Sequence, residues 1–227
     1  MKELHLPFHK LIKLFVIILT FSVALVTASN SDLVEKLFTK KLYIYVEKSY
    51  GKDSVDIIEQ WKQVIIDDLD SSDWNKLNAA NQFFNKNVAY KTDQVHWKQE
   101  DYWATPVESL GTGSGDCEDF AIAKYFTLKA MGVDTSKLRL MYVRALKWDE
   151  AHMVLIYNES PNAVPLVLDN IDKKIKPASQ RRDLKPIYSF NAEGLWLARG
   201  KGLGKKVKNN KGIAKWTEVM SRIENEK

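Results

Sequence analysis

The only cysteine of the chain, Cys117, is the first residue whose position could support catalysis. It follows glycines at Gly111, Gly113 and Gly115 and opens the segment CEDFAIAKYFTLKAMG, whose apolar spacing is typical of a helix. The N-terminus of a helix carries partial positive charge and free N–H groups, which favour the thiolate and can stabilise an oxyanion. Cys117 is therefore a candidate nucleophile, and a buried structural cysteine is the alternative.

A cysteine nucleophile needs an imidazole base, and the chain has four histidines. His5 and His9 fall in the N-terminal segment discussed below, which leaves His96 in a polar loop and His152 at the start of an apolar strand. A strand holds an imidazole more firmly than a loop does, so the pattern favours His152. The alternative is a structural histidine at a strand end.

A third residue follows from the expected strand register. If HMVLIY and VPLVLDN form a hairpin with 158–163 as its loop, Tyr157 opposes Val164 and His152 opposes Asp169. Opposed side chains share one face of a sheet, so the carboxylate of Asp169 could fix the imidazole tautomer. A bulge would break this register, and a strand-ending turn at Asp169 is the alternative interpretation.

Three carboxylates flank the candidate nucleophile, at Asp116, Glu118 and Asp119. Their negative charge should raise the pKa of Cys117 and oppose the effect of the helix start. A bound cation would remove this conflict, and oxygen ligands point to calcium, with Asp134 as a supplementary ligand. The alternative is that these residues only stabilise the N-terminus of the helix.

The spacing of apolar residues, which predicts the elements that position these side chains, changes along the chain. Helical spacing dominates the first half and strand-like alternation the second, which predicts one α+β domain. The expected helices cover 53–69, 73–88 and 117–132, with a less regular one at 31–50, and the expected strands cover 138–145, 152–157, 164–170 and 190–197.

Both ends of the chain differ from this domain. A basic start, an uncharged stretch and small residues near Ala28 predict a cleaved signal peptide over 1–28, with an uncleaved membrane anchor as the alternative. The domain then covers 29–199, and 200–227 is predicted to be a basic, mobile tail with a short helix around Trp216. The tail's excess of positive charge equals the net charge of +5 for the whole chain, so a nucleic-acid-binding face is not implied.

Three aromatic residues, Trp97, Tyr102 and Trp103, crowd the loop before the cysteine helix. Interior packing is the usual use of such side chains. The alternative is an exposed hydrophobic lip, where a substrate or a partner protein could dock beside the site.

The segments GDCEDFAIAKYFTL, HMVLIY and LDN, with NQFFNKNVAYKTD, DYWATPVESL and DLKPIYSFN, together resemble the bacterial transglutaminase-like cysteine proteinases of the LapG type. This resemblance implies a papain/transglutaminase-like fold, in which a helix bearing the catalytic cysteine packs on an antiparallel sheet. Cys117, His152 and Asp169 match the family's triad positions, and Asp116 and Glu118 match its calcium-binding positions.

The resemblance also implies a periplasmic protease that cuts a large biofilm adhesin near its N-terminus, at an Ala-Ala site. An inner-membrane cyclic-di-GMP receptor sequesters such proteases when cyclic-di-GMP is high. From the residues alone two other functions stay open: a transglutaminase or amidase acting on glutamine side chains, and a non-catalytic binding module that keeps the fold.

Overall fold

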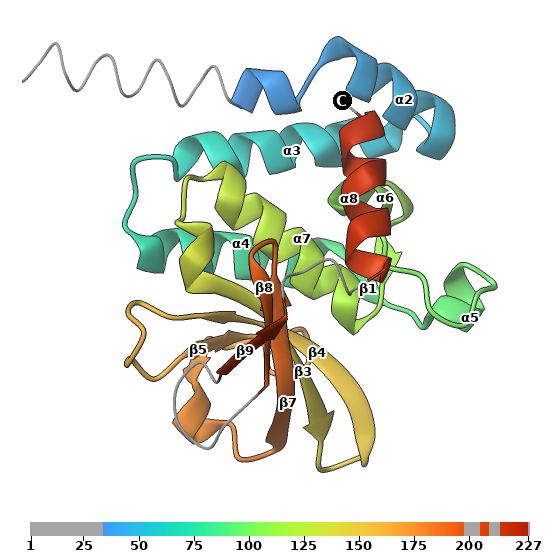
Figure 1. The fold of residues 1–227 in the computed structure, drawn as a ribbon. Coiled ribbons are helices and arrows are strands. Elements are labelled where there is room, and N and C mark those ends of the chain that lie inside the picture. The colour runs from blue at the N-terminus through green and yellow to red at the C-terminus, as the bar shows by residue number, and fades with distance from the viewer. Residues whose placement is uncertain (1–33, 198–204, 209–213, 227) are drawn as a thin grey trace, which may run out of the picture.

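The computed structural model describes residues 34–197, 205–208 and 214–226. The predicted signal peptide lies outside the described residues. A layer of helices covers one face of an antiparallel sheet, and the helix bearing Cys117 lies between the outer helices and the sheet (Figure 1). The predicted α+β fold is confirmed. The helices are α2 (Lys40–Tyr50), α3 (Asp53–Asp67), α4 (Asp73–Asn87), α5 (Asp93–His96), α6 (Pro106–Thr112), α7 (Cys117–Ala130) and α8 (Ala214–Glu226).

Within the described residues the main sheet has seven strands in the order β6-β5-β4-β3-β7-β8-β9, each antiparallel to its neighbours. Two short strands pair in parallel as a separate sheet just before α7. The short strands are β1 (Ala89–Tyr90) and β2 (Ser114–Gly115), and the main sheet contains β3 (Leu138–Ala145), β4 (Glu150–Tyr157), β5 (Leu166–Leu168), β6 (Lys176–Pro177), β7 (Leu184–Asn191), β8 (Gly194–Leu197) and β9 (Lys205–Lys208).

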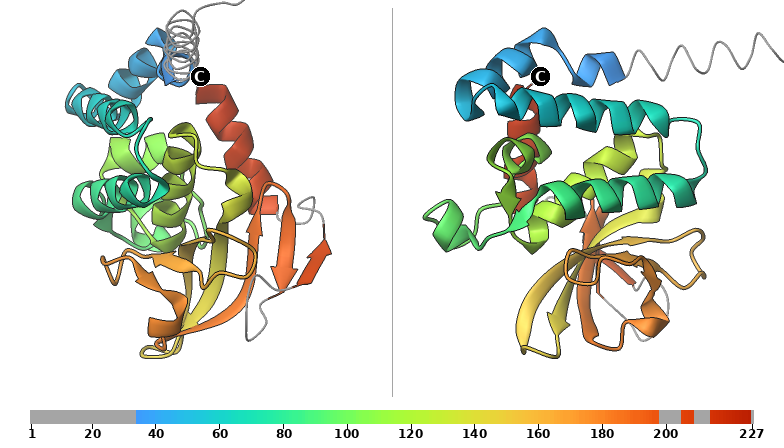
Figure 2. Two further views of the ribbon diagram at one scale, coloured as in Figure 1. Left: turned by 90° about the vertical axis from the view of Figure 1, so that its left-hand side faces the viewer. Right: turned by 180° about the vertical axis from the view of Figure 1, so that it is seen from behind.

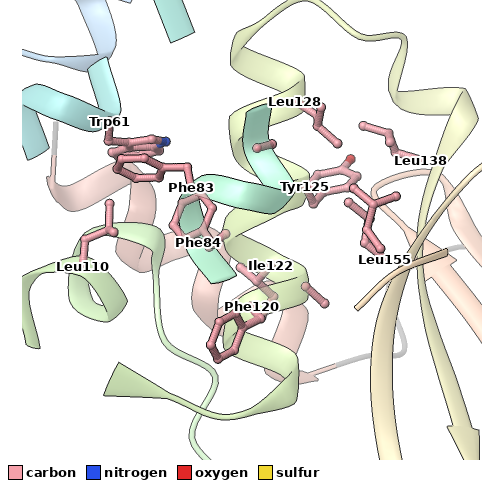
Figure 3. Packing of buried hydrophobic residues seen from close by; sticks show 14 of the residues in the cluster. Trp61, Phe83, Phe84, Leu110, Phe120, Ile122, Tyr125, Leu128, Leu138 and Leu155 are labelled. Atoms are coloured by element: carbon pink, nitrogen blue, oxygen red, sulfur yellow. The ribbon is translucent and has the colours of Figure 1, made fainter. Parts of the chain in front are cut away.

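One hydrophobic core joins the two layers (Figure 3). Tyr125 and Leu128 on α7 face Leu138 and Leu155 on the sheet, while aromatic side chains from α3 and α4 fill the other side. The one polar group of Trp61 is satisfied, because its indole N–H donates to Thr127 Oγ1 of α7 at 2.8 Å. The helix bearing Cys117 is thus held on both sides.

The last helix, α8, packs against the helical layer beside α2 and α6 (Figures 1 and 2). Trp216 is buried and stacks on Phe126 of α7, with ring centroids 5.7 Å apart, and Val219 is buried as well. The short helix predicted around Trp216 is therefore found. This helix follows the segment 200–212 that the sequence predicts to be mobile, and it is amphipathic and buries its apolar face.

Among the described residues, no helix is both long enough and apolar enough to cross a membrane.

Candidate active site

Cys117 is the first residue of α7, as its sequence context predicts. The chain reaches it through Gly113, whose φ of 64° is left-handed and ends α6, and through the pairing of β2 with β1. Asp116 and Asp119 form a capping box at the start of the helix, in which each carboxylate accepts from the backbone N–H of the other residue. These local features orient the cysteine toward the sheet, where α7 packs on β4.

The thiol of Cys117 lies among acidic groups. It donates to Glu118 Oε2 at 2.9 Å. Burial raises its pKa well above the ordinary value, with the negative charges of Glu118 and Asp116 adding to the rise, and a hydrogen bond from the Met153 backbone works in the opposite direction. The expected conflict between the helix start and its carboxylates is therefore present. The sulfur therefore contacts Met153, the residue that follows His152 on β4.

His152 and Asp169 are in direct contact. His152 Nε2 lies 2.9 Å from Asp169 Oδ1, and both side chains are buried. Burial opposes ionisation of Asp169, yet the hydrogen bond and charge of His152, together with Ile171 N–H and Arg181, hold its pKa well below the ordinary value. This contact leaves Nδ1 as the ring nitrogen available to a thiol.

The register that led to this pair is wrong by two residues. Tyr157 opposes Leu166 instead of Val164, so Asp169 lies diagonal to His152 and not directly opposite it. Pro165 has no N–H to donate to the ladder, and Val164 is exposed, so β5 begins at Leu166. A shift of two keeps every side chain on its face, which is why the expected contact survives.

Two acidic residues that the sequence interpretation missed complete the cluster beside Cys117. Carboxylate oxygens of Asp93, Asp116 and Asp119 lie within 4.8 Å of one another, and those of Asp93, Asp101 and Glu118 form a second such group. Asp93 is only 4% exposed although it comes from the segment predicted to be a loop. Its place in the NVAYKTD segment was the available signal, but local sequence does not reveal that a loop aspartate is buried.

The cluster contains oxygens that no donor satisfies. Asp93 Oδ1 and Asp116 Oδ1 are buried and have no hydrogen-bond partner within the described part of the chain. Burial, with the charge of Glu118, raises the pKa of Asp93 to about 6 and that of Asp116 to about 10. Unpaired carboxylates are costly to bury, so this arrangement fits a cation bound by hard oxygen ligands.

The two remaining predicted ligands, Asp119 and Asp134, differ in where they lie: Asp119 belongs to the acidic cluster and Asp134 does not. Asp119 is fully buried, and its two oxygens accept from Ala104 N at 2.7 Å and from Asp116 N at 3.1 Å. It thus ties the loop before α6 to the start of α7. Asp134 is exposed, caps a turn by accepting from Ser136 N at 2.9 Å, and belongs to none of the acidic groups beside Cys117. The prediction of Asp134 as a ligand is wrong. Asp134 follows the C-terminal end of α7, whereas the acidic cluster lies at the N-terminal end of that helix.

The three aromatic residues do not form one exposed lip. Trp103 is buried and stacks on Phe190 of β7, with ring centroids 5.7 Å apart. Its prediction as a lip residue is wrong. Trp97 and Tyr102 are half-buried and pack on each other at 4.6 Å, and the Tyr102 hydroxyl donates to Glu108 Oε1 at 2.7 Å. The other candidate base, His96, contacts Thr112 Oγ1 through Nε2 at 3.0 Å.

A cysteine at a helix start, beside a strand that carries a histidine bonded to an aspartate, is the arrangement of transglutaminase-like cysteine hydrolases. The family profile of the bacterial transglutaminase-like cysteine proteinases matches residues 51–188, and the chain belongs to this family of cysteine peptidases. No curated protein matches the chain.

Solved structures of LapG from Legionella pneumophila are similar over most of the chain. The EGTA-treated form is 41% identical, covers 81% of this chain and 96% of its own, and superposes with a TM-score of 0.72. A second LapG structure has the same identity and coverage with a TM-score of 0.70. The calcium-bound form is 40% identical, covers 84% of this chain and 98% of its own, and has a TM-score of 0.70.

Proposed function

We propose that this peptidase is a calcium-dependent periplasmic endopeptidase with Cys117 as nucleophile, His152 as base and Asp169 as the residue that orients the base. The observation that carries the proposal is the buried contact between His152 and Asp169 at 2.9 Å. The residue after His152 on the same strand, Met153, contacts the sulfur of Cys117 through its backbone. Asp169 takes Nε2 and leaves Nδ1 for the thiol.

The reaction follows from these positions. Nδ1 of His152 accepts the thiol proton, and the sulfur of Cys117 attacks the peptide carbonyl carbon to form a tetrahedral oxyanion. N–H groups at the start of α7 are suited to stabilise that charge. The C–N bond then breaks as the imidazole gives its proton to the leaving amine, and water attacks the thioester to release the acid and the free thiol.

Calcium is proposed from the unpaired buried oxygens of Asp93 and Asp116 together with the calcium-bound form of LapG. Asp116, Glu118 and Asp93 would hold the ion, and Asp101, which groups with Asp93 and Glu118, would supplement them. A divalent charge there lets the carboxylates ionise and offsets the negative potential that raises the pKa of Cys117. Asp119 supports this site by holding Asp116 and Ala104 with its own oxygens.

For the substrate we propose the N-terminal region of a large cell-surface adhesin, cut at an Ala-Ala bond, with an inner-membrane cyclic-di-GMP receptor as the sequestering partner. The predicted signal peptide supports export to the periplasm. Substrate and receptor rest on the family resemblance and on 41% identity to LapG.

The test is digestion of the recombinant N-terminal region of such an adhesin from the same genome, with calcium present. We expect one backbone cut by the wild-type protein and none by Cys117→Ala. Ammonia release with isopeptide crosslinking, or cleavage that persists in Cys117→Ala, would contradict the proposal.

A further inference from the structure

The carboxylate of Asp169 has a second strong partner besides His152. Arg181 Nη2 donates to Asp169 Oδ2 at 2.7 Å, while Oδ1 accepts from Ile171 N at 3.1 Å and contacts His152 Nε2. The Asp169 side chain is 0% exposed and that of Arg181 is 3% exposed. Both oxygens are therefore occupied, and a fully buried ion pair lies directly behind the imidazole.

Arg181 is itself fixed in place. It follows η2 (Ala178–Gln180), and its Nε and Nη2 donate to the two carboxylate oxygens of Asp183 at 3.0 and 2.8 Å. Asp183 is half-exposed, so solvent screens its charge, whereas the charge of Asp169 is sealed from water. The nitrogen that donates to Asp169, Nη2, also donates to Asp183, so the contact with Asp183 fixes the group that reaches Asp169.

The backbone of Asp169 is held as well. Its carbonyl accepts from Lys124 Nζ at 3.0 Å and from Asn85 Nδ2 at 2.9 Å, and Lys124 also donates to Asn85 Oδ1 at 2.9 Å. Burial lowers the pKa of Lys124 to about 7, against the attraction of Asp169. Arg181, whose guanidinium stays protonated throughout the range in which proteins fold, is the permanent cation against the Asp169 carboxylate.

We propose that Arg181 is a positioning residue that locks Asp169 toward His152 and neutralises its charge, so that the imidazole faces an ion pair instead of a lone carboxylate. This inference rests on the proposed roles of His152 and Asp169. The titratable and charged groups on the elements that pack around the imidazole are Asp169 and Arg181 from the segments after β5 and η2, Lys124, Cys117 and Glu118 on α7, and Glu150 at the start of its own strand.

The consequence is a defined shift in proton affinity. Without Arg181 the buried negative charge of Asp169 is uncompensated, which favours protonated forms of every group nearby. The midpoint of the His152 titration should therefore move to higher pH, by on the order of one pH unit. The pH–rate profile of cleavage should move in the same direction, whichever protonation state of the cysteine–histidine pair is active.

The experiment follows the imidazole by NMR in the calcium-loaded protein, with the His152 signal identified by its loss in His152→Gln. The variants are Arg181→Gln, Arg181→Lys, which keeps the charge, and Asp183→Asn, which removes only the screened partner. We expect the titration midpoint to rise in Arg181→Gln and to stay near wild type in Arg181→Lys. Asp183→Asn should move it little, and downward.

Two results would overturn the inference: an unchanged midpoint in folded Arg181→Gln, or an equal rise in Arg181→Lys. If Arg181→Gln does not fold, the Arg181→Lys and Asp183→Asn titrations still decide, because loss of the Nε2–H tautomer in Arg181→Lys or an upward shift in Asp183→Asn contradicts it. The readout needs no substrate. If the His152 midpoint rises in Arg181→Gln but the wild-type protein cleaves no adhesin fragment, the role of Arg181 is supported. Only the proposed substrate is then contradicted.

Discussion

Replacing Asp93 by asparagine separates the cost of burying its charge from its use as a calcium ligand. Asp93 Oδ2 accepts from Tyr102 N at 2.5 Å, while Oδ1 is buried beside the acidic oxygens of Asp116 and Asp119. Asparagine keeps the shape and the acceptor for Tyr102. Its amide group can donate to Asp116 Oδ1, which has no partner within the described segments.

The magnitude follows from the pKa of Asp93, which burial raises from 3.8 to about 6. A rise of about two pH units corresponds to about 3 kcal/mol of folding free energy. Because the pKa is higher in the folded state, burial of Asp93 costs no stability below about pH 4, where the carboxyl is protonated in both states. The wild type then loses up to this amount of stability as the pH rises through about 6 and the buried carboxyl must ionise. In the calcium-free protein, Asp93→Asn should therefore be more stable than wild type at pH 7 by up to about 3 kcal/mol, with no gain near pH 4.

The assay is thermal unfolding at both pH values, with EGTA and with excess calcium. A stability gain of about 3 kcal/mol raises the melting temperature of a chain of this size by roughly 6–12 °C. Calcium at about one hundred times its dissociation constant should stabilise the wild type by about 2.7 kcal/mol, and Asp93→Asn much less. Asp134→Asn is the matched control and should change neither quantity, because Asp134 is exposed and distant from the cluster.

Two results would contradict the role given to Asp93: a calcium-free Asp93→Asn protein less stable than wild type at pH 7, or a variant that calcium stabilises as much as the wild type. The first result would mean that the carboxylate has a donor that outweighs its burial. The second would mean that the ion is held without Asp93.

Three further predictions follow from the site and its surroundings. Cys117→Ala should lower cleavage by roughly 10³-fold or more while leaving the melting temperature near wild type, and substantial residual cleavage would exclude Cys117 as nucleophile. EGTA should stop cleavage of the adhesin fragment, and calcium but not magnesium should restore it, since Mg²⁺ demands a smaller octahedral site; full activity in EGTA would contradict this. Trp103→Ala should cost about 3–5 kcal/mol, because its ring is buried on Phe190, whereas Trp97→Glu should cost less; equal melting temperatures would contradict the difference.

Much of the framework was accessible from residue spacing. The apolar period after Asp53 predicts α3 (Asp53–Asp67) and the period after Asp73 predicts α4 (Asp73–Asn87) within a few residues. These helices bury one face against a single core, so the local pattern and the tertiary packing agree. The strands were also predictable in type, because β-branched and aromatic residues alternate through the second half.

Register and burial were less accessible. The start of β5 depended on Pro165, whose missing N–H removes Val164 from the ladder and shifts the pairing by two residues. The burial of Asp93 depends on how the segment 91–105 folds against α7, and no local pattern encodes that contact. Arg181 shows the same limit, because its fork reaches Asp169 only after η2 and β5 are placed side by side.

The most direct measurement of the central claim is a search for the acyl-enzyme. Wild-type protein and adhesin fragment are mixed with calcium, quenched in acid within the first turnover and examined by intact-mass spectrometry and peptide mapping. Cys117 is the only cysteine in the chain, so a thioester can be assigned without ambiguity. The proposed mechanism predicts an adhesin fragment attached to the peptide that contains Cys117, absent in Cys117→Ala. An acyl group on another residue, or cleavage by Cys117→Ala at the wild-type rate, would contradict it.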